Sequence, residues 1–137
     1  MSQTRPVSFI TLEGAKVLAL AAEAEALKRG WTVAVAIVDP TGGLVLFHTL
    51  DGTQPASQDV AIAKARTAAR FKRPTKAMED AVAGGRMSLL SVSEFALMLE
   101  GGVPIAREGT IIGAIGVSGM TSAQDGEIAA AALAAFG

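Results

Sequence analysis

Two hydrophobic periods divide the N-terminal part of the chain into a helix and a strand. Residues 11–29 are rich in Ala and Leu, and the flanking Thr11 and Gly30 are typical of the N-cap and the C-terminal stop of a helix. In residues 31–39, which follow, apolar side chains occupy both faces of an extended chain. This pattern predicts an internal strand that is covered on both sides.

A hairpin and a second helix are expected next. The turn sequence DPTGG, residues 39–43, separates the first strand from a second apolar strand over residues 44–50. A loop over residues 51–57 then ends in Ser57, which is a good N-cap. The helical pattern that begins there runs to about Phe71.

Shorter elements follow the second helix. After the helix-breaking sequence RPT, Thr75 is suited to cap a short helix that runs to about Ala83, where Gly84 and Gly85 end it. The pattern over residues 86–95 is ambiguous, and we expect a loop with a short helix there.

The C-terminal part predicts three strands and a final helix. The strands are expected over residues 95–100, 102–108 and 110–119. A hairpin turn at Glu108 and Gly109 joins the last two strands. Thr121 or Ser122 is expected to cap an Ala-rich helix, with Asp125 near its positive end.

The order of these elements predicts the fold class. Strands that follow one another through hairpins pair antiparallel, so we expect an α+β sandwich with a five-stranded antiparallel sheet flanked by helices. At 137 residues, without a linker or an internal repeat, the chain is expected to form a single domain over residues 1–137.

Composition narrows the classes of function. The net charge of -1 and the scarcity of aromatic residues, with five Phe, one Trp and no Tyr, argue against a nucleic-acid partner. No apolar run approaches the length of about 20 residues that spans a bilayer, and the N-terminus lacks a secretory signal, so we expect a cytoplasmic protein. The high apolar fraction of a short chain favours a homo-oligomer.

Phosphate and metal motifs are poorly represented. The segment GAIGVSG lies inside a predicted strand and lacks the Lys-Ser/Thr pair of a phosphate loop. One His and no Cys cannot build a closed zinc site, and no acidic loop has the spacing of a magnesium or calcium site. We therefore expect no site for a free metal ion.

Lys64 is a cation within the apolar stripe of the second helix. On a helical wheel it falls in the same arc as Val60, Ala68 and Phe71. Its stem could pack against the core while the ammonium reaches water. Alternatively, the ammonium projects into a pocket, where it holds an anion or acts as an acid or base.

Two neighbouring features could act with Lys64 on a small carboxylate. Arg73 follows the helix in a loop and is a candidate for carboxylate binding. In EGGVP, residues 100–104, the glycines form either a tight turn or a nest of backbone N–H groups for an oxyanion.

His48 is the only histidine of the chain, and it closes the apolar row of the second strand just before an Asp-Gly loop. An isolated histidine at such a place is either a hydrogen-bonded edge residue or a ligand or proton carrier. We interpret it as a rim residue of a possible site.

Three motifs in a fixed order resemble the GlcG/HbpS-type family, which is also described as a haem-degrading domain family. They are VDPTGGL through the Asp-Gly loop, AIAKARTA, and GGVP followed by GAIGVSG. The resemblance extends from about Thr11 to Phe136. It implies a profilin-like sandwich and homo-oligomers such as dimers, tetramers or octamers. Domains of this type are also seen fused to corrinoid adenosyltransferases.

The resemblance marks several positions of this chain as family-like: Asp39, Asp51, Gly52, Lys64, Thr67, Gly101, Gly102, Pro104 and Ser118. Together with Val103, the residues Asp51, Gly101, Gly102 and Pro104 are therefore candidate ligand contacts. His48 departs from the family pattern, which usually has arginine or another residue there.

Three classes of function follow. Some family members bind haem or a related tetrapyrrole. Among the side chains that ligate haem iron the chain has only His48 and methionines, so His48 would be the natural axial ligand here. Alternatively, the protein is a cofactor-free isomerase, tautomerase, hydratase or hydrolase for a small carboxylate, in which Lys64 and Arg73 hold the acid and His48 or Glu100 moves protons. A structural accessory protein is the third possibility.

Overall fold

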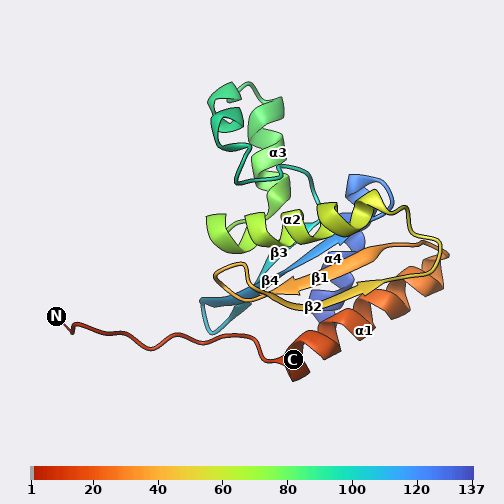
Figure 1. The fold of residues 1–137 in the computed structure, drawn as a ribbon, viewed down its shortest axis with the longest axis horizontal. Helices are drawn as coiled ribbons and strands as arrows, with labels where there is room; N and C mark the ends of the chain where they lie inside the picture. Colours follow the sequence, from red (N-terminus) through yellow and green to blue (C-terminus); the bar gives the residue numbers. More distant parts are fainter. Residues whose placement is uncertain (1) are drawn as a thin grey trace.

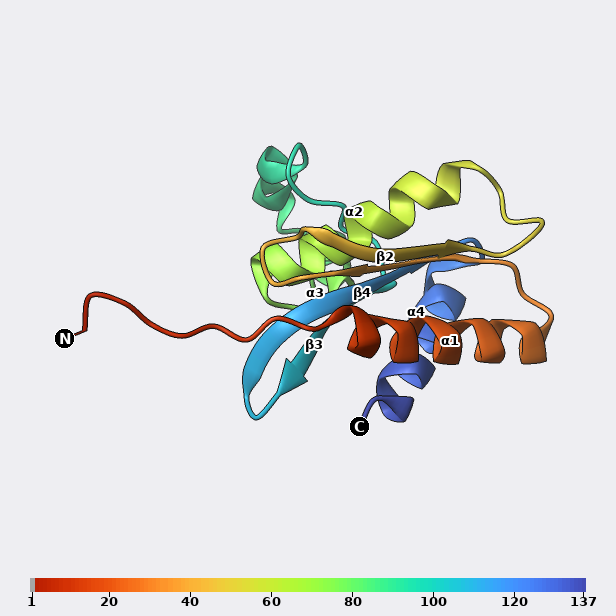
Figure 2. The same cartoon turned by 60° about the horizontal axis from the view of Figure 1, so that its bottom comes forward.

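A four-stranded antiparallel sheet forms the centre of the protein, in a computed structural model that describes residues 2–137. The strands follow the order β2-β1-β4-β3. Helices α1 and α4 cover one face of this sheet and α2 covers the other (Figures 1 and 2). The elements are α1 Leu12–Arg29, β1 Ala34–Val38, β2 Leu44–Thr49, α2 Ala56–Phe71, α3 Thr75–Ala83, the 3-10 helix η1 Met87–Val92, β3 Gly102–Arg107, β4 Thr110–Ser118 and α4 Ser122–Ala135.

The α+β class and the antiparallel sheet flanked by helices are confirmed, but the number of strands was wrong. Residues 95–100, expected to be the third strand, form turns and irregular structure. Their backbone bonds side chains instead of a neighbouring strand: Leu97 N donates to Thr67 Oγ1 at 2.8 Å, and Glu100 N to Glu79 Oε1 at 2.8 Å. Side chains of α2 and α3 thus accept hydrogen bonds from backbone N–H groups that would otherwise need a paired strand.

The two faces of the sheet are packed differently. The face toward α1 and α4 is built from large aliphatic side chains, such as Leu18, Ile37 and Ile115. The face toward α2 is built mostly from alanines and from Gly116, where a Cβ would collide with the backbone of α2. Small residues on both surfaces let α2 lie unusually close to the strands, which positions Lys64 within the fold.

Several predicted helix ends are confirmed. The Thr11 side chain accepts from Gly14 N at 3.0 Å, and Gly30 ends α1 with φ 71°. At α4, Thr121 and Gln124 form a capping box.

Two predicted caps were wrong. Helix α2 begins at Ala56, so Ser57 lies buried inside its first turn, where its hydroxyl accepts from Gln54 Nε2. Thr75 is the first residue of α3 rather than its cap, because its hydroxyl is hydrogen-bonded to Gly102.

Two segments extend from the body. Residues 2–9 form an extended arm at the N-terminus, and α3 with η1 forms a protrusion beyond α2 (Figure 1). Over residues 2–137, no helix combines the length and apolarity needed to cross a membrane.

Candidate functional site

Lys64 is locked into a buried ion pair. Its side chain is 2% exposed, and its Nζ donates to Asp125 Oδ2 and to the carbonyl oxygen of Val117, both at 3.0 Å. The interpretation in which the ammonium reaches water was therefore wrong. The pair joins α2 to the first turn of α4 at the end of β4.

Asp125 is the partner that sequence reasoning did not connect to Lys64. Its carboxylate also accepts from Met120 N at 2.9 Å. Burial raises the pKa of Asp125 above its usual value, although the Met120 N–H and the Lys64 ammonium oppose that rise. The partners are 61 positions apart in the sequence, so no local pattern signals their contact.

Gly101 and Gly102 lie directly against Lys64. Gly101 has φ +132°, and a Cβ there would collide with Lys64 Nζ and the Val117 carbonyl. The N–H of Gly102 already donates to Thr75 Oγ1 at 2.9 Å. Both glycines thus let the backbone approach α2 closely, and the Gly102 N–H is not available to an oxyanion. Val103 and Pro104 continue from them into β3.

Glu100 lies near this pair but faces other groups. Its Oε1 is 3.8 Å from Lys76 Nζ, and its carboxylate lies against Gly126 in the first turn of α4. Its side chain is 21% exposed.

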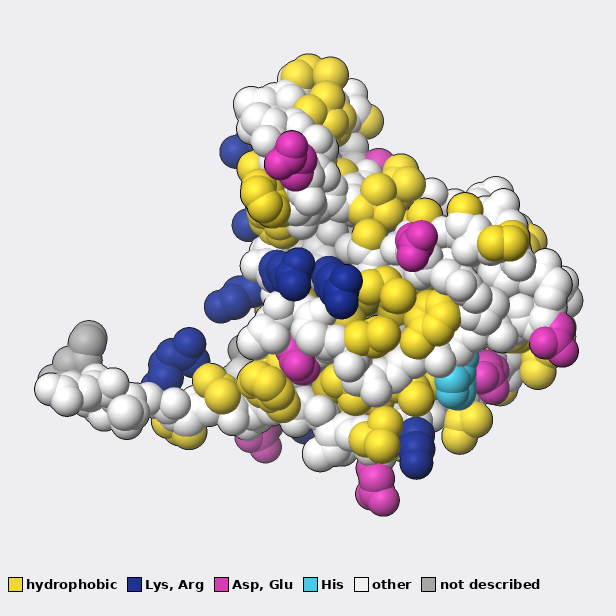
Figure 3. Space-filling view, in the orientation of Figure 1, with side chains coloured by type: hydrophobic (Ala, Val, Ile, Leu, Met, Phe, Trp, Pro, Cys, Tyr) yellow, Lys and Arg dark blue, Asp and Glu magenta, His cyan; other side chains and the backbone are white. Residues whose placement is uncertain are grey.

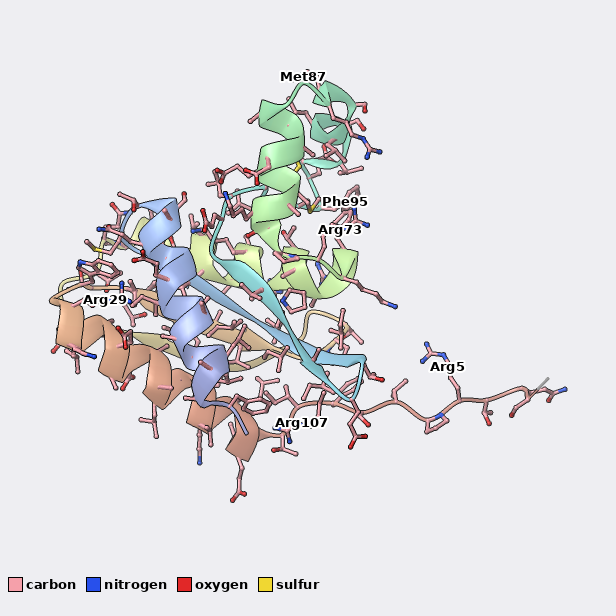
Figure 4. All side chains as sticks on the ribbon, turned by 180° about the vertical axis from the view of Figure 1, so that it is seen from behind. Arg5, Arg29, Arg73, Met87, Phe95 and Arg107 are labelled. Carbon is pink, nitrogen blue, oxygen red and sulfur yellow. The ribbon has the colours of Figure 1, made fainter. Side chains whose placement is uncertain are left out.

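Arg73 and Asp51 lie apart from Lys64. Arg73 is exposed at the junction of α2 and α3 (Figure 4), where its Nε donates to the Phe71 carbonyl at 3.1 Å. Asp51 is exposed in the loop between β2 and α2. Three surface clefts of about 490, 600 and 730 Å³ are lined by residues other than these, Lys64 or His48. The arrangement therefore lends no support to a carboxylate site at Lys64, because a ligand would have to displace Asp125.

His48 is arranged differently from Lys64. It pairs with Val35 in the sheet and faces α1, where its Nδ1 is in contact with the Glu23 carboxylate. The two side chains are 31% and 30% exposed. Among residues 2–137, Nδ1 makes this contact with Glu23 but no regular hydrogen bond, and no hydrogen bond involves Nε2 of the ring. A carboxylate at one nitrogen of a histidine fixes the ring and leaves the other nitrogen for a ligand.

Apolar side chains are exposed beside this pair. Leu20 and Leu27 are the helical neighbours of Glu23, and they are 59% and 69% exposed. Leu44, on the strand of His48, is 45% exposed. Figure 3 shows the His48 ring at the surface among hydrophobic and acidic side chains. Glu23 was missed because an acidic residue in an Ala-rich helix is usually a solvated one.

The part of the chain that the structure describes contains no cluster of side chains suited to bind a free metal ion. No three His, Cys, Asp or Glu side chains gather within residues 2–137. Any iron held by His48 would need most of its ligands from another source, such as a porphyrin.

Comparisons with known proteins agree with the motifs. The family described as "Haem degrading protein HbpS-like" matches residues 10–134. Protein GlcG of Escherichia coli K12 is 41% identical over 110 residues, which are 80% of this chain and 81% of that protein. A double mutant of Streptomyces reticuli HbpS superposes with a TM-score of 0.90 at 33% identity, covering 100% and 93% of the two chains. The PduOC:haem complex gives 0.83 at 30% identity, covering 93% and 94%.

Proposed function

Since the chain belongs to the HbpS-like family of haem-degrading proteins, we propose that it binds haem or a related tetrapyrrole, with His48 as the iron ligand. The observation that carries this proposal is the His48–Glu23 pair. It supports the proposal because it holds a lone imidazole at an apolar surface with Nε2 unbonded.

The residues around His48 fit the chemistry of haem. Histidine is a common axial ligand of haem iron, and a carboxylate on its other nitrogen orients the ring and increases its basicity. When bound, haem supplies the iron and a flat apolar macrocycle. Leu20, Leu27 and Leu44 offer apolar surface for that macrocycle, and Lys16, exposed on the same flank of α1 as Glu23, offers charge for a propionate.

Two further statements belong to the same proposal. We propose that the protein is cytoplasmic and forms homo-oligomers, which its exposed leucines support. The predicted roles of Lys64, Arg73 and Glu100 in carboxylate chemistry stay predictions without support from the geometry.

Haem titration tests the proposal. Wild-type protein should bind haem stoichiometrically with a shifted Soret band. His48→Ala should lose that band and bind at least tenfold more weakly, since the iron loses its only histidine. Arg86→Ala, an exposed change between α3 and η1, serves as the control and should bind as the wild type does. Unchanged affinity and an unchanged spectrum in His48→Ala would overturn the assignment.

A further inference from the structure

We propose that the outer edge of β2 pairs antiparallel with β2 of a second copy of this chain, which extends the sheet across a two-fold axis. The sheet has two edge strands, β2 and β3, and both expose backbone groups to pairing. Edge strands that remain unpaired are usually protected by Pro, by charge or by a covering segment.

The two edges differ in this protection. Strand β3 carries Pro104, which has no N–H, and ends in Arg107. Strand β2, with the sequence LVLFHT, has no Pro, Lys, Arg, Asp or Glu. Two copies of β2 can therefore approach one another without a missing donor or a repulsion between charged side chains.

The register identifies the free groups. Leu50 N donates to Val33 O, and His48 lies opposite Val35 in the same antiparallel pair. By the alternation of such ladders, His48 directs its backbone groups to β1, whereas Phe47 and Thr49 direct theirs outward. Among residues 2–137, no backbone hydrogen bond outside the β1 ladder reaches the N–H or C=O of Phe47 or Thr49.

A second copy fits this edge better than an unrelated peptide. An antiparallel pair of identical strands obeys two-fold symmetry, and each copy offers the same donors and acceptors to the other. The exposed Leu20 and Leu27 lie on the flank of α1 that faces β2 through Glu23. A two-fold axis perpendicular to the sheet brings both α1 helices to the same face of the joined sheet.

The inference does not depend on haem, because the pairing uses backbone groups of Phe47 and Thr49 rather than the His48 ring. The first test is the mass of the haem-free protein by light scattering at micromolar concentration. Thr49→Pro removes an outward donor without breaking the β1 ladder, and it should halve the mass. Thr49→Val keeps the donor and should leave the mass unchanged. A monomeric wild type, or a folded Thr49→Pro with the wild-type mass, would overturn the proposal.

Cross-linking provides a second test that does not depend on how Thr49→Pro folds. The chain has no cysteine, so a single introduced cysteine can form a disulfide only with the same cysteine of a second copy. Residues whose backbone groups point outward pair only with equivalent residues of the second copy. In any symmetric register, therefore, one residue of β2 lies opposite the same residue of the second copy, at a distance that a disulfide can span. In a cysteine scan of β2, at Leu44, Val45, Leu46, Phe47, His48 and Thr49, one variant should give a covalent dimer on oxidation, whereas Ala106→Cys on β3 should not. Failure of the whole scan, or equal dimer from Ala106→Cys, would contradict the pairing.

Discussion

The pairs Lys64–Asp125 and His48–Glu23 have similar chemistry and opposite surroundings. Both partners of the first are 2% exposed, and the Lys64 ammonium is occupied by a carboxylate and a carbonyl. Both partners of the second are about one-third exposed, and the imidazole contacts the Glu23 carboxylate only through Nδ1. The difference indicates that the buried pair has a structural role, because its charged groups already bond one another. The partly exposed pair is the one to which we assign the proposed ligand.

The largest expected effect comes from breaking the buried pair. Lys64→Met leaves the Asp125 carboxylate without its cation, and removal of one partner of a buried pair costs about 3–5 kcal/mol. We expect a loss of that size in the free energy of unfolding measured with urea.

The double variant Lys64→Met/Asp125→Leu is the control for this loss. It should recover most of the stability, since apolar replacement of both partners leaves no buried charge. A single variant as stable as the wild type would show that the pair is dispensable.

The loss in Lys64→Met should also depend on pH. Burial already raises the pKa of Asp125 above 3.8, and removal of the opposing ammonium raises it further. A raised folded-state pKa means that the contribution to stability is complete below about 3.8 and is lost as pH rises through the folded-state value. Urea unfolding should therefore show a smaller deficit at about pH 4 than at about pH 7. A deficit independent of pH would contradict this assignment of the charge.

A smaller loss is expected where the start of β3 approaches Lys64. In Gly102→Ala the new methyl group would meet the Lys64 backbone and the Thr75 side chain. Overpacking of this kind costs about 1–3 kcal/mol. Thermal unfolding measures this cost, and a Tm equal to that of the wild type would contradict the close contact between Gly102 and α2.

The smallest effect on stability is expected at the exposed pair. Glu23→Gln should change the free energy of unfolding by only about 0–1 kcal/mol, as exposed ion pairs do. Haem affinity should fall by about 10–100-fold, because the group that orients the ligating imidazole is lost. Urea unfolding and haem titration of the same variant measure the two values. A large loss of stability with unchanged haem affinity would show that Glu23 has a structural role and does not orient a haem ligand.

Local patterns predicted most of the fold and little of the sites. The caps at Thr11 and Thr121 depend on neighbouring residues, so the sequence was sufficient for them. The expected strand over 95–100 was wrong because distant side chains, Thr67 and Glu79, satisfy its backbone. Helical periodicity located Lys64 on the buried stripe, but it could not show that Asp125 fills the place predicted for a ligand. Glu23 was missed for the same reason, since its partner is on another element.

Chemical rescue of a cavity at position 48 tests the central claim most directly. In His48→Gly, added imidazole can occupy the space of the lost ring and supply the nitrogen that the iron needs. We predict that this variant shows no bound-haem Soret band on its own and regains a wild-type-like band when imidazole is added. A full Soret band without imidazole, at the wild-type position, would show that His48 does not hold the haem.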